Sequence, residues 1–210
     1  MTDAQQFTFK AETKQLLHIL IHSLYKDREV FLRELLSNAS DAINRLRFEM
    51  LTNQNVLDPN AELKIHMKVD KDNRTITVQD TGIGMTQDEL IDHLGTIAQS
   101  SARKFMEAAK ENNQDASGLI GQFGVGFYSV FMVAEWVRVT SRSFRPEAQA
   151  VTWYATGDDT YQISPAEMSE RGTRIEIKLK EDAAEFADDY RLKNIIHKHS
   201  DYIGFPIYVG

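Results

Sequence analysis

Residues 75–85 read Thr75-Ile76-Thr77-Val78-Gln79-Asp80-Thr81-Gly82-Ile83-Gly84-Met85, an alternating segment followed by a glycine-rich turn. Polar and apolar side chains alternate up to Asp80, which is the period of a half-buried strand. On that period Asp80 points toward the core, where a carboxylate is costly unless other groups donate hydrogen bonds to it. Gly82 and Gly84 then allow a ligand to approach the backbone closely. The segment indicates a buried carboxylate that recognises a polar edge of a bound molecule, with an ordinary strand end and turn as the alternative.

Composition limits the class of protein. The chain has 210 residues, of which 42% are hydrophobic, and this size favours a single domain with one core. It contains no cysteine, which excludes a disulfide scaffold and thiolate chemistry. A formal net charge of -7 argues against a nucleic-acid partner, because phosphate backbones require clustered Lys and Arg. We expect neither a membrane helix nor a signal peptide, and therefore a cytoplasmic protein with no membrane partner.

Residues 27–50 predict a long amphipathic helix with Asp27 as its N-cap. Glu34, Asn38 and Asp41 are spaced four and three residues apart, so they share one side of this helix at the margin of its apolar face. Polar groups in that position indicate that the helix packs against a polar cavity. A solvated helix edge is the alternative. The apolar face itself consists of Phe31, Leu35, Ala39, Ala42 and Leu46.

A second glycine-rich segment covers residues 118–126 and precedes an apolar run at 127–134, where we expect a helix. Glycines at 121, 124 and 126 leave backbone amides open to a ligand, and a helix N-terminus adds positive potential. These features suit phosphate binding. The segment is not the Walker pattern, because no Gly-Lys-Ser/Thr follows it.

The remaining periodicities predict the other elements of an α/β chain. Thr86 and Glu89 have the spacing of a capping box at the start of a short helix. We expect the strand at 63–69 to pair antiparallel with that at 75–80. Further strands are predicted around 7–9 and at 136–141, 150–155 and 173–180, and further helices at 12–25, 103–110 and 188–199.

Four groups of residues occur in the order of the nucleotide-binding boxes of the gyrase, chaperone, histidine-kinase and mismatch-repair ATPase superfamily. They are Glu34-x-x-x-Asn38-x-x-Asp41, Asp80-x-Gly82-x-Gly84, Gly121-Gln122-Phe123-Gly124-Val125-Gly126 and Gly172-Thr173. More narrowly, residues 31–42 and 120–129 resemble the ninety-kilodalton heat-shock protein family, and its bacterial branch in particular. The resemblance extends from about residue 7 to residue 207.

This resemblance implies a fold and a domain organisation. The fold is an α/β (α+β) two-layer sandwich, with helices on one face of a mixed, largely antiparallel sheet. Residues 1–210 would form a single N-terminal nucleotide-binding domain with a lid segment at about 95–126. The middle and dimerisation domains of the family lie outside this chain.

The resemblance also implies roles for individual residues. Glu34 resembles the general base that activates the attacking water, and Asn38 resembles the residue that holds Mg²⁺ against the phosphates. Asp80 resembles the acceptor of the adenine amino group, assisted by ordered water and Thr173. The full set of residues expected to contact nucleotide is Asn38, Asp41, Ala42, Asp80, Gly84, Met85, His93, Leu94, Gly121, Gln122, Phe123, Gly124, Val125, Gly126, Phe127 and Thr173.

The function that the resemblance implies is ATP hydrolysis coupled to lid closure, in a molecular chaperone that assists the folding of client proteins. The cofactors would be ATP or ADP and Mg²⁺. The partners would be clients and co-chaperones, with a second copy of the full-length protein forming a homodimer. The chain departs from the family pattern at the start of the lid, where Gln99 replaces the usual lysine and Ser101 the usual glycine, and His93 replaces an asparagine common in eukaryotic relatives.

Other members of the superfamily provide alternatives. A histidine kinase would need a separate helical domain carrying the phosphorylated histidine, and a DNA-acting enzyme would need a basic face, which the net charge of -7 disfavours. A binding module without hydrolysis would be favoured by loss of Glu34 or Asn38, and both are present.

Overall fold

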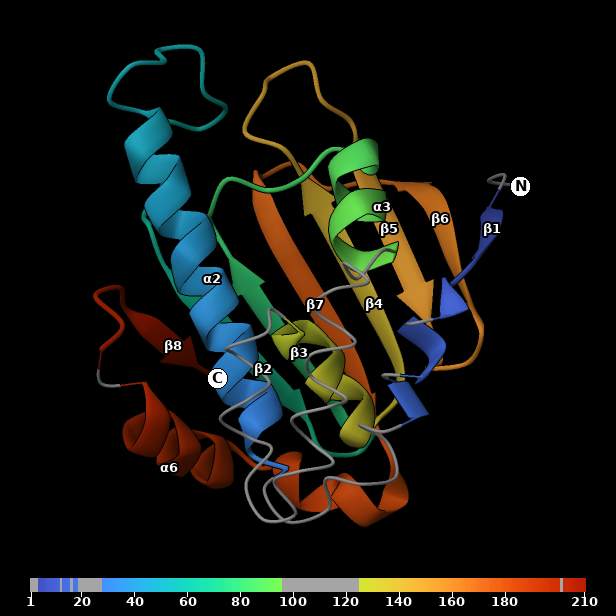
Figure 1. Ribbon diagram of the computed structural model, residues 1–210. Coiled ribbons are helices and arrows are strands. Elements are labelled where there is room, and N and C mark those ends of the chain that lie inside the picture. The colour runs from blue at the N-terminus through green and yellow to red at the C-terminus, as the bar shows by residue number, and fades with distance from the viewer. Residues whose placement is uncertain (1–3, 12, 16, 19–27, 96–124, 201) are drawn as a thin grey trace, which may run out of the picture.

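A single β-sheet organises the chain (Figure 1). The computed structural model describes residues 4–11, 13–15, 17–18, 28–95, 125–200 and 202–210. Within these residues, eight strands form the sheet in the order β1-β6-β5-β4-β7-β3-β2-β8. Neighbouring strands are antiparallel except for β2 and β8, which are parallel. The strands are β1 (Gln5–Thr8), β2 (Ile65–Asp70), β3 (Thr75–Asp80), β4 (Ala134–Arg142), β5 (Ala150–Ala155), β6 (Thr160–Ala166), β7 (Gly172–Leu179) and β8 (Ile207–Val209).

The helices form a second layer. In Figure 1, α2 crosses in front of β3 and β2, α3 lies in front of β4 and β5, and the sheet lies behind them. The predicted two-layer sandwich with a mixed, largely antiparallel sheet is therefore confirmed. Among the described residues, the α-helices with full bounds are α2 (Val30–Glu49), α3 (Gln87–Gly95) and α6 (Asp189–His199), and the 3₁₀ helices are η1 (Gly126–Met132) and η2 (Glu181–Phe186).

The core lies between the two layers. Ile76, Val78 and Asp80 of β3 are buried at alternate positions, as the sequence period predicts. Apolar residues of α2 cover them, including Phe31 and Leu35, which are 0% and 1% exposed. Because Asp80 continues the buried row of β3, the strand delivers a carboxylate into this interior.

Several predicted elements are confirmed. β2 and β3 pair antiparallel. The capping box is present, with Thr86 N–H donating to Glu89 Oε2 at 2.8 Å and Glu89 N–H donating to Thr86 Oγ1 at 3.4 Å. The predicted strands at 136–141, 150–155 and 173–180 correspond to β4, β5 and β7, and the helix at 188–199 corresponds to α6.

Other expectations are corrected. Glu29 occupies the N-cap position of α2 and makes no capping hydrogen bond with its side chain, so Asp27 as the N-cap is wrong. The apolar run after Gly126 forms the short 3₁₀ helix η1 and then enters β4. β6 and β8 were not predicted. The helix expected at 103–110 and most of the lid lie outside the described residues. No described helix has the length and apolar character needed to cross a membrane.

Candidate functional site

Asp80 is the most unusual residue at the end of β3, because it is a carboxylate only 5% exposed. Its Oδ1 accepts a hydrogen bond from the Gly82 N–H at 2.8 Å, and the backbone N–H of Thr173 also donates to the carboxyl group. Burial raises the pKa of Asp80 to about 7, because removal from water penalises the charged form more than these donors favour it. The side chain is therefore a positioned hydrogen-bond acceptor, and further donors would stabilise its charged form.

Thr173 and Ser141 flank Asp80 on the neighbouring strands. Thr173 of β7 is opposite Asp80 in the register of β3 and β7, and Ser141 of β4 is opposite Thr173. The Ser141 Oγ lies 2.9 Å from the Thr173 Oγ1 and accepts a hydrogen bond from the Met85 N–H at 2.9 Å. A buried hydroxyl pair thus connects the strand beside Asp80 to the turn that follows it.

The turn after β3 fits only because it contains glycine. Gly84 has φ +62°, and a Cβ there would lie 1.8 Å from the carbonyl oxygen of Arg142. The neighbouring Ile83 N–H donates to the Ala42 carbonyl oxygen at 3.1 Å, which fixes the turn against α2. The structure therefore brings Ala42, Gly84 and Met85 together with Asp80 and Thr173, and their contact with nucleotide stays a prediction.

Glu34 forms a second part of the candidate site with η1. It is 8% exposed, and a Cβ on Gly126 would lie 2.3 Å from Glu34 Oε2, so the Gly126 backbone lies directly against this carboxylate. Arg33 holds the other oxygen, with its Nη2 2.9 Å and its Nε 3.2 Å from Glu34 Oε1. Asn38 and Asp41 are exposed on the same helix. That they border a polar cavity stays a prediction.

The end of α3 contacts the start of η1. The buried Tyr128 hydroxyl donates to the Leu94 carbonyl oxygen at 2.6 Å, while the adjacent His93 is exposed. Val125 is buried, and the Phe127 ring contacts Trp153 at a centroid distance of 5.7 Å. The predicted phosphate-loop residues Gly121, Gln122, Phe123 and Gly124 lie outside the described residues.

Comparison with known proteins identifies the family. A family profile described as "Histidine kinase-, DNA gyrase B-, and HSP90-like ATPase" matches residues 25–185. The chain belongs to this ATPase family. It is 52% identical over 207 residues to the chaperone protein HtpG of Chlorobium chlorochromatii, covering 98% of this chain and 33% of that protein. The chaperone protein HtpG of Escherichia coli O1:K1 is 48% identical over 201 residues, covering 95% of this chain and 32% of that protein.

Membership of the histidine kinase-, gyrase- and HSP90-like ATPases makes this chain an ATP-binding ATPase domain. The chain spans about a third of the length of the curated relatives that it matches. The matched region begins before α2 and ends in η2, so it contains Glu34, Asp80 and Thr173. The family match thus covers all the described elements that build the candidate site.

Sequence reasoning missed Ser141 and Arg33 in this ATPase domain. Ser141 is one of several small polar residues in β4, and only the pairing of β4 with β7 reveals its contact with Thr173. Arg33 precedes Glu34 directly, yet a sequence neighbour on a helix projects to another side unless its long side chain turns back. The adjacency of Arg33 and Glu34 was the available signal.

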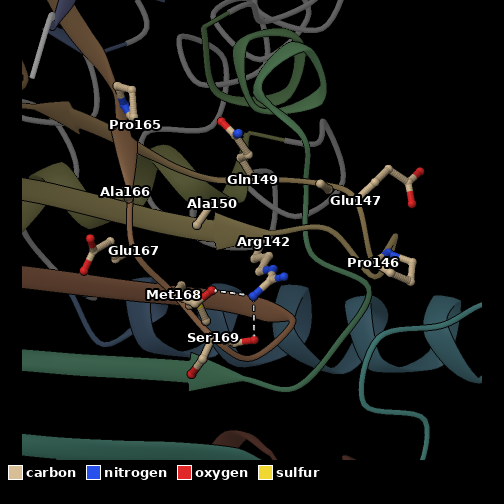
Figure 2. A pocket seen from close by; sticks show the side chains of 11 residues that line it. Arg142, Pro146, Glu147, Gln149, Ala150, Pro165, Ala166, Glu167, Met168 and Ser169 are labelled. Atoms are coloured by element: carbon tan, nitrogen blue, oxygen red, sulfur yellow. Dashed lines mark hydrogen bonds between the residues drawn. The ribbon is translucent and has the colours of Figure 1, made fainter.

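A hollow of about 520 Å³ lies apart from Asp80, between the ends of β4, β5 and β6 (Figure 2). Arg142 reaches across it, and its Nη1 donates to the carbonyl oxygens of Met168 at 2.9 Å and Ser169 at 2.7 Å. These hydrogen bonds tie the segment between β6 and β7 to β4. Arg142 directly follows Ser141 in β4, so these hydrogen bonds also anchor the end of the strand that carries Ser141.

Proposed function

We propose that this chain is the N-terminal nucleotide-binding domain of a molecular chaperone of the HtpG type, with a lid at about residues 95–126. In the full-length protein, hydrolysis of ATP would drive lid closure and conformational cycling that assist the folding of client proteins. The names of the relatives support the chaperone assignment. A cytoplasmic homodimer that acts with co-chaperones is the corresponding cellular form.

The single observation that carries the nucleotide site is the buried Asp80. Its carboxylate accepts from backbone N–H groups on two sides and still carries a raised pKa, because burial outweighs those bonds. A ligand amino group would supply the missing donor, and the adenine amino group is such a donor. Gly84, Met85 and Thr173 would line the pocket around the base, with Asp41, Ala42, His93 and Leu94 completing it.

Glu34 is proposed as the general base. Arg33 holds Oε1, and Oε2 faces the backbone of Gly126. Residues 121–127 would cradle the phosphates with their amides, so Glu34 Oε2 would lie beside the phosphate end of the nucleotide. In this proposal the carboxylate would lie within reach of a water that attacks the terminal phosphate.

The chain's residues also fit a Mg²⁺ ion. Mg²⁺ is usually bound by one or two protein oxygens together with phosphate oxygens and water. Asn38 is exposed one helical turn from Glu34, and an amide oxygen there suits this coordination. In this proposal Asn38 and the phosphates would hold the ion together, with water completing its coordination.

The test separates binding from hydrolysis. Isothermal titration calorimetry with ADP, with and without Mg²⁺, should show binding to the wild-type chain and none to Asp80→Asn. Glu34→Ala should keep ADP affinity and lower hydrolysis by about 10²–10⁴-fold, which is the usual contribution of a general base. Hydrolysis is measured as phosphate release from the full-length protein. Normal ADP affinity in a folded Asp80→Asn protein would disprove the adenine assignment, and normal turnover in Glu34→Ala would disprove the role of Glu34.

A further inference from the structure

Ser141 makes three polar contacts with its hydroxyl and is completely buried, at 0% exposure. The Met85 N–H donates to Ser141 Oγ at 2.9 Å. Ser141 Oγ in turn donates to the Gly172 carbonyl oxygen at 3.1 Å, and it lies 2.9 Å from Thr173 Oγ1. A serine hydroxyl offers one donor and two acceptor positions, so three partners can use its full hydrogen-bonding capacity.

The chemistry of these partners fixes the direction of each bond. A backbone N–H can only donate and a carbonyl oxygen can only accept, so Met85 donates to Ser141 and Ser141 donates to Gly172. The single proton of Ser141 is then in use. The contact with Thr173 must therefore run from the Thr173 hydroxyl to Ser141, which commits the Thr173 proton to the interior. Toward a ligand, Thr173 Oγ1 presents only lone pairs.

We propose that Ser141 is a positioning residue that makes the base pocket accept hydrogen bonds, and thereby selects a purine with an amino group at position 6. This inference rests on the proposed nucleotide site. Asp80 in its charged form is an acceptor only, and Ser141 turns Thr173 into a second acceptor beside it. The two lie opposite each other in the register of β3 and β7, and both are buried, with exposures of 5% and 7%.

The consequence is discrimination between amino and keto purines. Adenine carries an amino group at position 6 and can donate to these acceptors. Hypoxanthine carries a carbonyl oxygen there, which would face the two acceptors with no proton between them, because its own donor, N1–H, lies at the neighbouring ring position. A site built to pair one hydrogen-bonding pattern rejects the analogue that leaves buried polar groups unpaired. The selectivity belongs to the charged state of Asp80, so it is measured at about pH 8, where Asp80, with a pKa of about 7, is mostly charged and the N1–H of inosine diphosphate is still largely protonated.

The experiment compares ADP with inosine diphosphate by calorimetry on the 210-residue chain. Wild type should prefer ADP by at least about a hundredfold. In Ser141→Ala the Thr173 proton is released and can turn toward the keto oxygen, so the preference for ADP should fall by about tenfold or more. Ser141→Thr keeps the hydroxyl and is the matched control, which should retain the wild-type preference.

The outcomes distinguish a role of Ser141 in base selectivity from a role in the fold alone. If Ser141 only supports the fold, Ser141→Ala will weaken both nucleotides equally, and an unchanged ratio would overturn the proposal. If Ser141→Ala does not fold, Thr173→Val provides the test: it removes one acceptor, so it should lower ADP affinity and should not lower that of inosine diphosphate. Equal loss of both would again overturn the proposal. Failure of wild type to bind ADP would disprove the proposed function itself, whereas equal binding of the two nucleotides disproves only the role of Ser141.

Discussion

Replacement of Asp80 by asparagine should stabilise the empty protein at alkaline pH. Burial raises the pKa of Asp80 from 3.8 to about 7, so between these values the folded state binds a proton that the unfolded state has lost. The contribution of Asp80 to the free energy of unfolding therefore falls as pH rises toward 7 and is constant above it. Between about pH 5 and about pH 9 this loss amounts to roughly 3 kcal/mol, at ~1.4 kcal/mol per pKa unit. Asparagine does not titrate and avoids it.

The assay is urea unfolding of wild type and Asp80→Asn without nucleotide, at several pH values between about 5 and 9. We expect the variant's free energy of unfolding, relative to wild type, to increase by about 3 kcal/mol across this range. Any constant cost of the asparagine amide cancels in this comparison. Asp92→Asn, at an exposed position of α3, is the matched control for the change from a carboxyl to an amide.

Bound nucleotide should make wild type more stable than Asp80→Asn at alkaline pH. A ligand that binds only the folded state adds about 2.7 kcal/mol at a hundredfold excess over its Kd, and Asp80→Asn should not gain it. The reasoning would be refuted if the difference between wild type and Asp80→Asn stayed within about 1 kcal/mol over the whole range, or if it changed in the opposite direction.

Three further substitutions test the packing around the site. Gly84→Ala places a Cβ 1.8 Å from a backbone oxygen at φ +62° and should lower the free energy of unfolding by at least ~2 kcal/mol. Gly204→Ala is the control and should cost far less, because the added Cβ meets nothing within 4 Å. Equal urea midpoints for the two variants would contradict this prediction. Tyr128→Phe removes the 2.6 Å hydrogen bond to α3 and should cost about 1–2 kcal/mol in the same assay. Gly126→Ala should displace the Glu34 carboxylate and lower phosphate release by up to ~100-fold, and unchanged release would separate Glu34 from catalysis.

Local patterns in the sequence were sufficient for much of the architecture. The alternation in β3 placed Asp80 in the interior, and the structure buries it. The helical spacing of apolar residues located α2, and the Thr86–Glu89 capping box located α3. These features depend on interactions within a few residues, so their periods remain readable without the rest of the chain.

Elements that depend on pairing with residues far away in the sequence were harder to predict. β6 contains Pro165, which lowers its resemblance to a strand, yet it pairs with both β1 and β5. β8 has three residues and exists through parallel pairing with β2, more than a hundred residues earlier in the sequence. The start of α2 was misplaced because a helix can begin without a side-chain cap when tertiary packing stabilises it.

In the candidate site, too, residues close in sequence were predicted and contacts between distant strands were not. Asp80 and its glycines are close in sequence and were found together, whereas Ser141 reaches Thr173 only because β4 and β7 are neighbours. This difference matters for function, because one carboxylate cannot by itself distinguish the bases that offer it a donor. In the proposed site, sequence local to β3 would therefore specify that a donor is bound, and the sheet topology would add the second acceptor that restricts which base supplies it.

The same buried carboxylate, Asp80, lowers the stability of the empty protein and would bind the adenine amino group. In the empty site, deprotonation of Asp80 is opposed by burial, so the folded protein loses stability as the pH approaches 7. A bound amino group donates to the charged form and favours it, so the proposed ligand and the deprotonated carboxylate stabilise each other. The affinity for adenine nucleotide should therefore rise over the pH range in which the stability of the empty protein falls. Asparagine cannot carry a negative charge, so Asp80→Asn removes the interaction through which nucleotide and carboxylate would stabilise each other.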